Sequence, residues 1–221
     1  ADDSLSAAEA FNEAIAGYRE IVSDGVENGK LYYNLANAYF RVGDVPRAIL
    51  YYRLAERLLP RDSQIEANLA FARSRVTDRI EPTETSQLLR LLLFAHYSWS
   101  LRERTGTAVS TFLAAWLLLG VRIWIPRRWL TASGLICVMI SASLAYSVYV
   151  QLEDENNHPI GVLVATDVVV RTGDGETYEP QFNRSLGAGV EVRVLERREL
   201  WIQIELPDGK RGWVRADQVA F

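Results

Sequence analysis

Few residues in this chain have the types and spacing that catalysis requires. The two histidines, His96 and His158, are far apart, and the only cysteine, Cys137, lies in the most apolar stretch. These positions form no Cys–His pair, and we find no glycine-rich phosphate loop before a helix and no cluster of carboxylates. A lone cysteine also excludes an internal disulfide and a thiolate metal site. The sequence therefore predicts a protein that is not an enzyme and that uses no metal or cofactor.

The polar side chains with the most regular spacing are asparagines, which suit binding rather than catalysis. Asn34 and Asn68 each begin an Asn-Leu-Ala motif, and they are 34 residues apart. An amide donates and accepts hydrogen bonds at once, so it can hold the backbone of an extended peptide without reading its side chains. The other interpretation is that both asparagines cap neighbouring backbone groups.

The same interval of 34 residues organises the N-terminal region. It aligns residues 14–15 with 48–49 and residues 34–36 with 68–70. This is the period of the tetratricopeptide repeat (TPR), and residues 29–62 resemble one complete repeat of two antiparallel helices. About two repeats are present, and about three are usually needed for an independent solenoid. We therefore expect another element or a partner to cover the open ends.

In a TPR the first helix of each unit lines the concave face. Residues three and four positions apart project from the same side of a helix, which places several polar and aromatic side chains on this face. The candidate partner-binding residues are Tyr33, Asn34, Asn37, Phe40 and Arg41, with Asn68 on the following helix.

A charge-poor region in the middle of the chain predicts a transmembrane hairpin. Residues 106–150 contain three arginines and no acidic residue, and the arginines lie between Arg122 and Arg128. The flanking segments, 106–125 and 129–150, each span roughly 30 Å as helices at about 1.5 Å per residue. By the positive-inside rule the arginine turn is cytoplasmic, which places both chain ends on the opposite side. The alternative is a pair of buried helices in a soluble core.

Two shorter segments bear on how the chain meets the membrane. Residues 88–99 are apolar but too short to span a bilayer, so we expect them at the membrane interface or beneath the helical repeat. The chain begins Ala1-Asp2-Asp3-Ser4, which fits a mature N-terminus left by signal-peptide cleavage, although a trimmed chain would look the same.

Beyond residue 159 the pattern changes to short runs of β-branched residues separated by turn residues. The expected strands are residues 162–170, 190–195, 201–206, 212–215 and 218–221. Asp208-Gly209 is a hairpin turn signal, and strands of this length with tight turns predict a small antiparallel barrel.

The order of these features resembles the bacterial SH3-like family. The resemblance rests on Val170-Arg171-Thr172-Gly173, on Trp201 at the start of a strand, and on Gly212-Trp213-Val214 near the end. It implies a surface that includes Arg171, Trp201 and Trp213. The other interpretation is that both tryptophans pack inside the domain, as aromatic residues of small barrels commonly do.

The succession of a TPR module, paired transmembrane helices and an SH3-like barrel resembles the BatE-like family of the Bacteroides aerotolerance (Bat) operon. Its most specific parts are the stretch 31–39, the motif 68–70 and the ending 212–214. The resemblance implies a bacterial inner-membrane protein with both soluble domains on the periplasmic side. It also implies partners among Bat proteins with von Willebrand factor A domains and a MoxR-type ATPase, in envelope integrity or oxidative-stress tolerance.

The sequence thus predicts a multidomain membrane protein made of all-α TPR helical hairpins, a two-helix transmembrane hairpin and a small all-β SH3-like barrel. The expected boundaries are 1–80 for the TPR module, 81–105 for a juxtamembrane segment, 106–150 for the hairpin and 151–221 for the SH3-like domain. The expected function is a non-enzymatic adaptor that binds proteins and membrane lipid. The alternative is a peptidoglycan-binding module that acts through the SH3-like domain. A net charge of -4 without a basic, aromatic-rich cluster disfavours nucleic acid.

Overall fold

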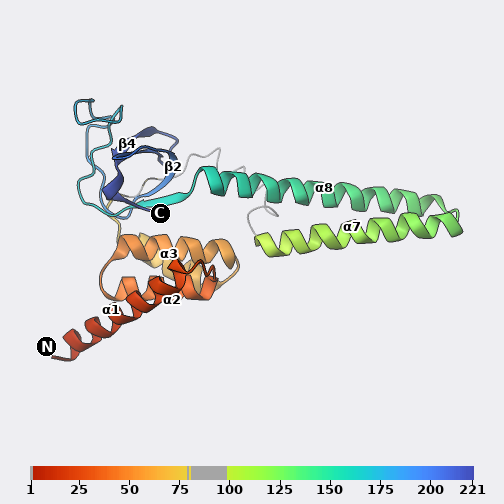
Figure 1. Cartoon of the computed structure of the whole chain (residues 1–221), viewed down its shortest axis with the longest axis horizontal. Coiled ribbons are helices and arrows are strands. Elements are labelled where there is room, and N and C mark those ends of the chain that lie inside the picture. The colour runs from red at the N-terminus through yellow and green to blue at the C-terminus, as the bar shows by residue number, and fades with distance from the viewer. Residues whose placement is uncertain (1, 79, 81–98) are drawn as a thin grey trace. The chain divides into compact units, whose positions relative to one another are not determined.

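The computed structural model describes residues 2–78, 80 and 99–221. These residues belong to two compact units. One unit contains four N-terminal helices and a C-terminal sheet, and the other contains a long helical pair (Figure 1). The predicted juxtamembrane segment 81–105 and the apolar segment 88–99 lie largely outside the described residues.

The N-terminal helices begin and end where the sequence offers side-chain caps. Their bounds are Asp2–Ser23 for α1, Gly29–Arg41 for α2, Val45–Leu58 for α3 and Ser63–Arg73 for α4. Asn28, Asp44 and Asp62 stand at the N-caps of α2, α3 and α4, and each side chain accepts hydrogen bonds from the first backbone N–H groups of its helix. Gly43, at φ +86°, forms the turn between α2 and α3.

The core of the helical part lies mainly between α2, α3 and α4. Leu35 and Ala36 of α2, Ala48 and Ile49 of α3, and Ala72 of α4 are fully buried. The small alanines let the helices approach closely, and the stacked rings of Tyr39 and Tyr51, 5.5 Å apart, fill the space beside them.

The C-terminal part is a five-stranded antiparallel sheet. Its strands are Ile160–Leu163 (β1), Glu191–Arg197 (β2), Trp201–Glu205 (β3), Arg211–Arg215 (β4) and Val219–Ala220 (β5), with a short 3₁₀ helix, Ala216–Gln218, before β5. The strand order is β4-β3-β2-β1-β5. Ile202, Ile204 and Val214 on one face join the core of the sheet with Leu163 and Val194.

The sheet is not closed into the barrel that the sequence predicts. The two edge strands, β4 and β5, do not pair, and β5 has only two residues. The expected strand 162–170 ends at Leu163, and the chain then forms isolated bridges, Val168 with Leu186 and Arg171 with Trp213. Turn-forming residues in 164–189 break the ladder that closure would need. The other strand positions match the prediction within about two residues.

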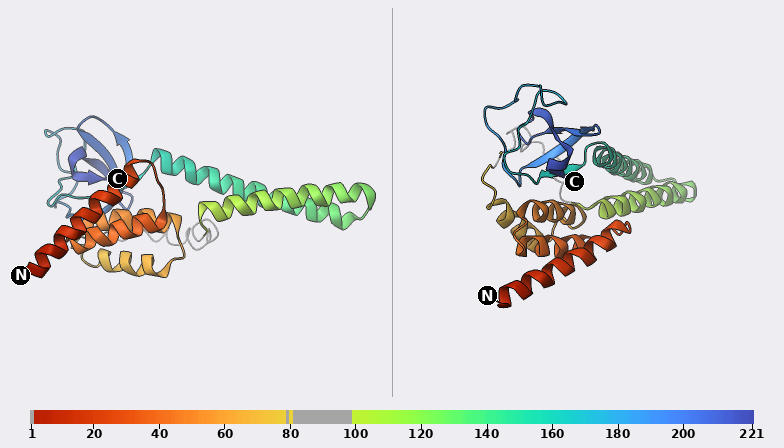
Figure 2. Two further views of the ribbon diagram at one scale, coloured as in Figure 1. Left: turned by 60° about the horizontal axis from the view of Figure 1, so that its bottom comes forward. Right: turned by 60° about the vertical axis from the view of Figure 1, so that its left-hand side comes forward.

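The helices and the sheet of this unit share an interface, whereas the sequence predicted only that another element or a partner would cover the helical repeat. Glu191 of β2 accepts two hydrogen bonds from Arg73, from Nε at 2.6 Å and from Nη2 at 2.9 Å, so the pair is bidentate. Arg53 Nε of α3 lies 3.0 Å from Glu191 Oε2. Val162 of β1 is fully buried within the helical core, and Val76, just after α4, contacts the cores of both parts. Both views in Figure 2 show the sheet next to the N-terminal helices, and α3 contacts β1. Part of the sheet domain therefore covers one side of the short helical array.

One glycine explains how closely the two parts approach. Gly189 has φ +92°, a left-handed conformation that favours glycine, and a Cβ built there would meet Val76 Cγ2 at 2.6 Å. Beside it, Gly187 N–H donates to Asp78 Oδ2 at 2.8 Å. The loop before β2 is thus shaped to fit the chain that leaves α4.

The second unit is a pair of long antiparallel helices, α7 from Leu101 to Trp124 and α8 from Arg128 to Asn157 (Figure 1). Both are longer than predicted: α7 begins five residues before the expected span, and α8 runs past the expected domain boundary at residue 151. Charged residues interrupt the apolar pattern at these ends. The helix nevertheless continues because Ser100 and Glu103 form a capping box and because Arg104 is buried against α8.

The two helices contact each other through small and polar residues. Ala108 and Ala115 of α7 are buried, and Ser141 of α8 donates to the carbonyl of Ala108 at 2.9 Å. Arg104, only 1% exposed, donates from Nη1 to Ser147 Oγ at 2.9 Å. Small residues and hydrogen bonds between helices are the usual means of packing in a bilayer.

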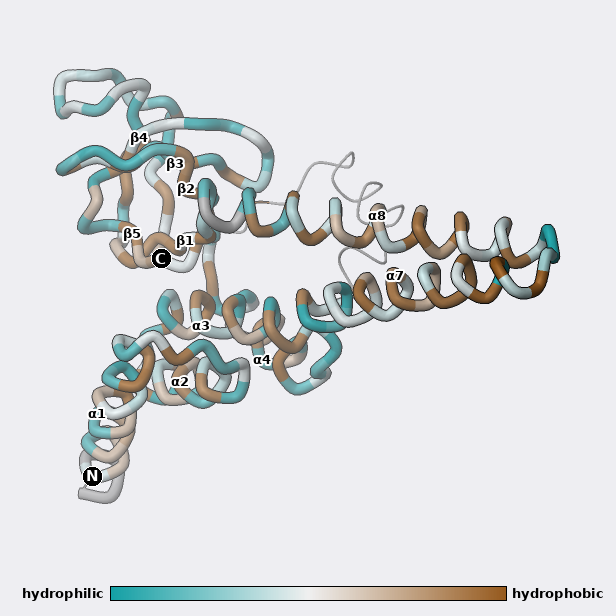
Figure 3. The backbone as a smooth tube through the Cα atoms, turned by 45° about the vertical axis from the view of Figure 1, so that its right-hand side comes forward, coloured by the Kyte–Doolittle hydropathy of each residue, from teal (hydrophilic) through white to brown (hydrophobic). Residues whose placement is uncertain are grey.

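The large apolar side chains of this unit lie on its outside. Both helices, over Leu101–Trp124 and Arg128–Asp154, are long and apolar enough to cross a membrane, and little of either is buried in the fold. Figure 3 shows hydrophobic residues along most of α7 and α8. The exposed set includes Phe112, Leu113, Trp116, Leu117, Leu135, Ile136 and Met139. The predicted pair of apolar helices is therefore present, and the outward position of its apolar residues disfavours a soluble core.

Candidate functional site

Four polar side chains from three helices form a network on the predicted binding face. Tyr52 Oη of α3 donates to Asn37 Oδ1 at 2.5 Å, and Asn68 Nδ2 of α4 donates to the same oxygen at 3.1 Å and to Tyr33 Oη at 3.0 Å. The structure therefore brings together Tyr33, Asn37 and Asn68 from the predicted set. Tyr52 was not predicted as a site residue, because its position in the repeat indicated only packing.

The network leaves amide groups available to a partner. Asn37 uses its oxygen, and Asn68 uses its nitrogen; within the described part of the chain, neither Asn37 Nδ2 nor Asn68 Oδ1 has a hydrogen-bond partner. One donor and one acceptor on neighbouring helices match the two groups that each residue of a peptide backbone presents. Both side chains are partly buried, so a bound backbone would be shielded from competing water.

The Tyr52 hydroxyl that supports Asn37 stays protonated at neutral pH. Burial raises the pKa of Tyr52 to about 12, and the nearby Tyr33 adds to this rise. Burial also raises the pKa of Tyr32, Tyr39 and Tyr51. Tyr52 therefore remains a hydrogen-bond donor and fixes Asn37 with its oxygen turned inward.

An aromatic pair continues the face beyond the amides. The rings of Phe40 and Phe71 are 5.5 Å apart and tilted, and the Arg75 guanidinium lies 4.9 Å from the centre of the Phe71 ring. Phe71 is 50% exposed although it is a large apolar residue. The prediction missed Phe71 and Arg75, but a signal existed, since Phe71 is three positions after Asn68 and so shares its side of α4.

The two remaining predicted residues, Asn34 and Arg41, are exposed on α2. Asn34 makes no hydrogen bond to any described residue, and the N-caps of α2 to α4 are Asn28, Asp44 and Asp62. Asn68 bonds to side chains rather than to a helix end. The capping interpretation of the repeated asparagines is therefore wrong for these two positions. We call the surface formed by Tyr33, Asn34, Asn37, Phe40, Arg41, Asn68, Phe71 and Arg75 the amide face.

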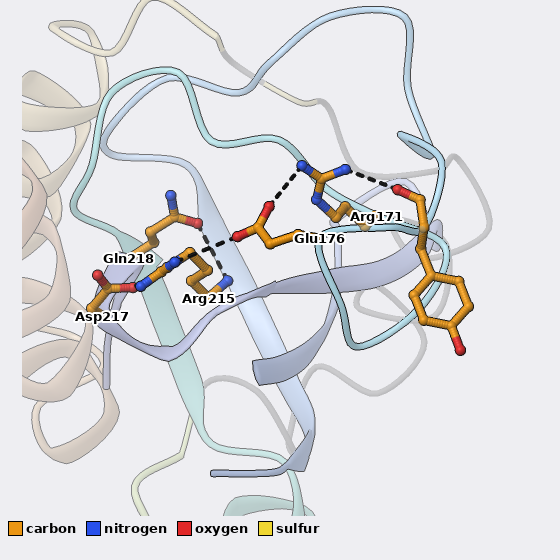
Figure 4. A network of polar contacts seen from close by, with 6 residues as sticks. Arg171, Glu176, Arg215, Asp217 and Gln218 are labelled. Atoms are coloured by element: carbon orange, nitrogen blue, oxygen red, sulfur yellow. Dashed lines mark hydrogen bonds and ion pairs between the residues drawn. The ribbon is translucent and has the colours of Figure 1, made fainter. Parts of the chain in front are cut away.

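The predicted surface of the sheet domain is largely occupied by the chain itself. Arg171 donates to the carbonyl of Tyr178 at 2.8 Å and to Glu176 Oε2 at 2.9 Å, and Arg215 reaches the other oxygen of Glu176 at 3.4 Å (Figure 4). Arg215 Nε also pairs with Asp217 at 3.2 Å. Glu176 thus pairs with both arginines.

The two tryptophans of this surface lie on adjacent strands. Trp201 is opposite Arg215, and Trp213 is opposite Gln203, so both project from the face that does not carry the buried isoleucines of β3. Trp213 is nevertheless only 6% exposed, because the Arg198 guanidinium lies 4.5 Å from the centre of its ring. The backbones of Trp213 and Arg171 also exchange two N–H···O hydrogen bonds, each 2.8 Å long. Trp213 therefore packs inside the domain, and Trp201 is partly exposed.

Gly212 allows this arrangement. A Cβ at residue 212 would meet Val170 Cγ1 at 2.3 Å and the carbonyl oxygen of Arg171 at 2.9 Å. The Gly-Trp pair of the sequence motif is thus explained by the close approach of residues 170–171 to β4.

Comparisons with protein-family models, with curated proteins and with solved structures found no match. Within the described residues, no group of three or more histidine, cysteine or acidic side chains is placed to hold a metal ion.

Proposed function

We propose that this chain is a non-enzymatic, membrane-anchored adaptor that binds an extended segment of a partner protein on the amide face. The observation that carries the proposal is the Tyr33–Asn37–Tyr52–Asn68 network, which fixes two amides and leaves Asn37 Nδ2 and Asn68 Oδ1 without a hydrogen-bond partner among the described residues. The exposed Phe71 beside it offers a contact for an apolar side chain of the partner.

The anchor in this proposal is the α7–α8 hairpin, with Arg122 to Arg128 in the cytoplasm and both soluble parts on the periplasmic side of a bacterial inner membrane. The length of both helices and their exposed apolar residues support membrane insertion. The arginine turn and the acid-free hairpin support the orientation.

The 34-residue repeat and its close-packed alanines support a TPR identity for α1 to α4. The order of elements supports a BatE-like role, beside Bat proteins with von Willebrand factor A domains and a MoxR-type ATPase. The SH3-like assignment rests on the sequence motifs and on the antiparallel sheet. The sheet differs from the expected barrel because its edge strands do not pair. The burial of Trp213 supports protein binding by the helices over peptidoglycan binding by the sheet.

The test compares partner capture by variants of the full chain in intact membranes. Asn34→Ala removes an exposed amide that makes no hydrogen bond to any described residue, and Phe71→Ser removes the exposed ring. The matched control is Asn12→Ala, since Asn12 is an exposed asparagine on α1. Crosslinked partners are identified by mass spectrometry, and thermal unfolding is measured for each variant.

We expect both face variants to lose captured partners while their unfolding temperatures stay close to that of Asn12→Ala. Capture that is equal in all variants would contradict the proposal. If the chain then co-sediments with purified peptidoglycan, the sheet domain is the recognition module instead.

A further inference from the structure

The hairpin has two chemically different ends. At the end where α7 starts, the described basic residues Arg102 and Arg104 are accompanied by Glu103 on α7 and by Glu153 and Asp154 on α8. Glu103 accepts from the Ser100 backbone at 2.9 Å, and Arg104 is buried against Ser147. Acidic residues therefore balance the basic charge at this end.

The other end, residues 122–129, carries basic residues without acidic ones, and we call it the tip. Only residues 125–127 separate α7 from α8, and hydrogen bonds from Arg127 N to Ile125 O at 2.7 Å and from Leu130 N to Arg127 O at 3.2 Å hold the turn. Arg122, Arg127 and Arg128 are exposed, and none has an ion pair among the described residues. No acidic residue lies anywhere in 106–150, so this end keeps three positive charges.

The tip also presents three exposed large apolar side chains, and two of them, Ile123 and Trp124, are the most exposed of their kind among the described residues. Ile123 is 84% exposed, Trp124 is 88% exposed and Trp129 is 62% exposed. Indole rings prefer the depth of the lipid headgroups, where one edge is wet and the other is apolar. Tryptophans on either side of an arginine turn therefore place the guanidinium groups at the level of the lipid phosphates.

We infer that the tip binds the phosphate groups of anionic phospholipids, which carry the negative charge that the protein lacks there. A guanidinium group forms paired hydrogen bonds with a phosphate, and three of them within seven residues can hold more than one headgroup. A zwitterionic lipid brings its own cation close to the arginines, whereas an anionic lipid does not. The inference rests on the proposed membrane insertion and adds a lipid preference to it.

The experiment uses the purified full chain reconstituted into vesicles with equal amounts of phosphatidylglycerol and phosphatidylcholine. The protein is extracted in mild detergent, and the two lipids that remain bound are quantified by mass spectrometry. The tip variant is Arg122→Gln/Arg127→Gln/Arg128→Gln. The matched control is Arg102→Gln, an exposed arginine at the opposite, balanced end of the same hairpin.

We expect the wild type and Arg102→Gln to retain phosphatidylglycerol in excess. Each arginine at the membrane surface favours anionic lipid about fivefold, so the tip variant should lose most of this excess. Raising the salt from about 0.1 M to about 1 M shortens the screening length from about 10 Å to about 3 Å and should weaken the preference of the wild type.

Retention of the two lipids in their bulk ratio by the wild type would overturn the inference, as would an equal excess in the tip variant. A separate measurement distinguishes membrane insertion from lipid preference. It is the resistance of the chain to alkaline carbonate extraction from vesicles of phosphatidylcholine alone. Extraction of the wild type there would refute membrane insertion itself. Insertion without lipid preference would refute only the lipid site.

Discussion

The two units of this chain use the same residue types in opposite ways. In the helix–sheet unit, apolar side chains such as Leu35 and Ile204 are buried, and arginines such as Arg73 and Arg171 meet carboxylates. In the hairpin, large apolar side chains are mostly outside and small or polar ones inside, and the arginines of the tip form no ion pair with any described acidic residue. The first pattern is typical of a domain that folds in water, and the second is the pattern expected of helices that pack in a bilayer.

The largest expected effect comes from a charge on the outer face of the hairpin. Met139, near the middle of α8, is 72% exposed. In a bilayer Met139→Lys should cost about 2.5–3.5 kcal/mol of insertion free energy, because lysine loses its hydration there. The fraction of chain that resists carbonate extraction measures this cost.

The matched change in the other unit is Leu200→Lys, at a residue that is 69% exposed. Since water solvates that position, the free energy of unfolding should change by less than about 0.5 kcal/mol. If Met139→Lys is as harmless as Leu200→Lys, the outer face of α8 is not in lipid.

A second change tests the close packing of the helical core. Ala48 of α3 is fully buried, and Ala48→Leu should lower the free energy of unfolding by about 1–3 kcal/mol because the added atoms have no space. Denaturation of the full chain in detergent micelles measures it. Ala70→Leu, on the exposed side of α4, is the control, and equal stability of the two variants would rule out the proposed contact.

The sequence predicted the elements better than their contacts. The 34-residue period located α2 to α4, and the charge-poor stretches located α7 and α8. What local patterns could not show are contacts between distant residues, such as Glu191 with Arg73 or Asn68 with Tyr33 and Asn37. The predicted closed barrel was wrong for a similar reason. The alternating valines of 162–170 indicate a strand, but they do not show whether a partner strand is present.

The site was predicted in part. Helical spacing placed Tyr33, Asn37 and Phe40 together on α2, and the repeat added Asn68. Tyr52 was assigned to packing alone, although its hydroxyl orients Asn37. A buried ring with a polar tip serves packing and hydrogen bonding at once, and only the structure shows where the hydroxyl points.

The interface between helices and sheet is tested by a double-mutant cycle on Arg73 and Glu191. Arg73→Met and Glu191→Gln should show a coupling energy of about 1–2 kcal/mol, because the pair is bidentate and partly buried. Unfolding of the four proteins in micelles supplies the values. Additive effects would mean that the ion pair does not hold the two parts together.

The smallest expected effect concerns the hydroxyl of Tyr52. Tyr52→Phe should lower the free energy of unfolding by about 1 kcal/mol at pH 7, because the hydrogen bond to Asn37 is lost. In the wild type the pKa of Tyr52 is about 12, whereas an unfolded tyrosine titrates near about 10. The folded state therefore holds more protons between these values, and stability is full below about pH 10 and falls as the pH rises toward about 12.

The pH series separates this residue from the other buried tyrosines. Tyr52→Phe should show a shallower loss of stability above about pH 10, with the remaining loss due to Tyr32, Tyr39 and Tyr51. Identical slopes for variant and wild type would show that Tyr52 does not titrate as a buried group.

The most direct measurement of the proposed anchoring is the labelling of single cysteines from one side of the membrane. Cys137 is replaced by serine, and one cysteine is placed at Ser4, Arg128 or Gln218, in the α1 helix, the tip and the sheet domain. A membrane-impermeant thiol reagent is then added to intact spheroplasts. A hairpin with both soluble parts outside predicts labelling at positions 4 and 218 and protection at 128, and labelling at 128 alone would contradict it.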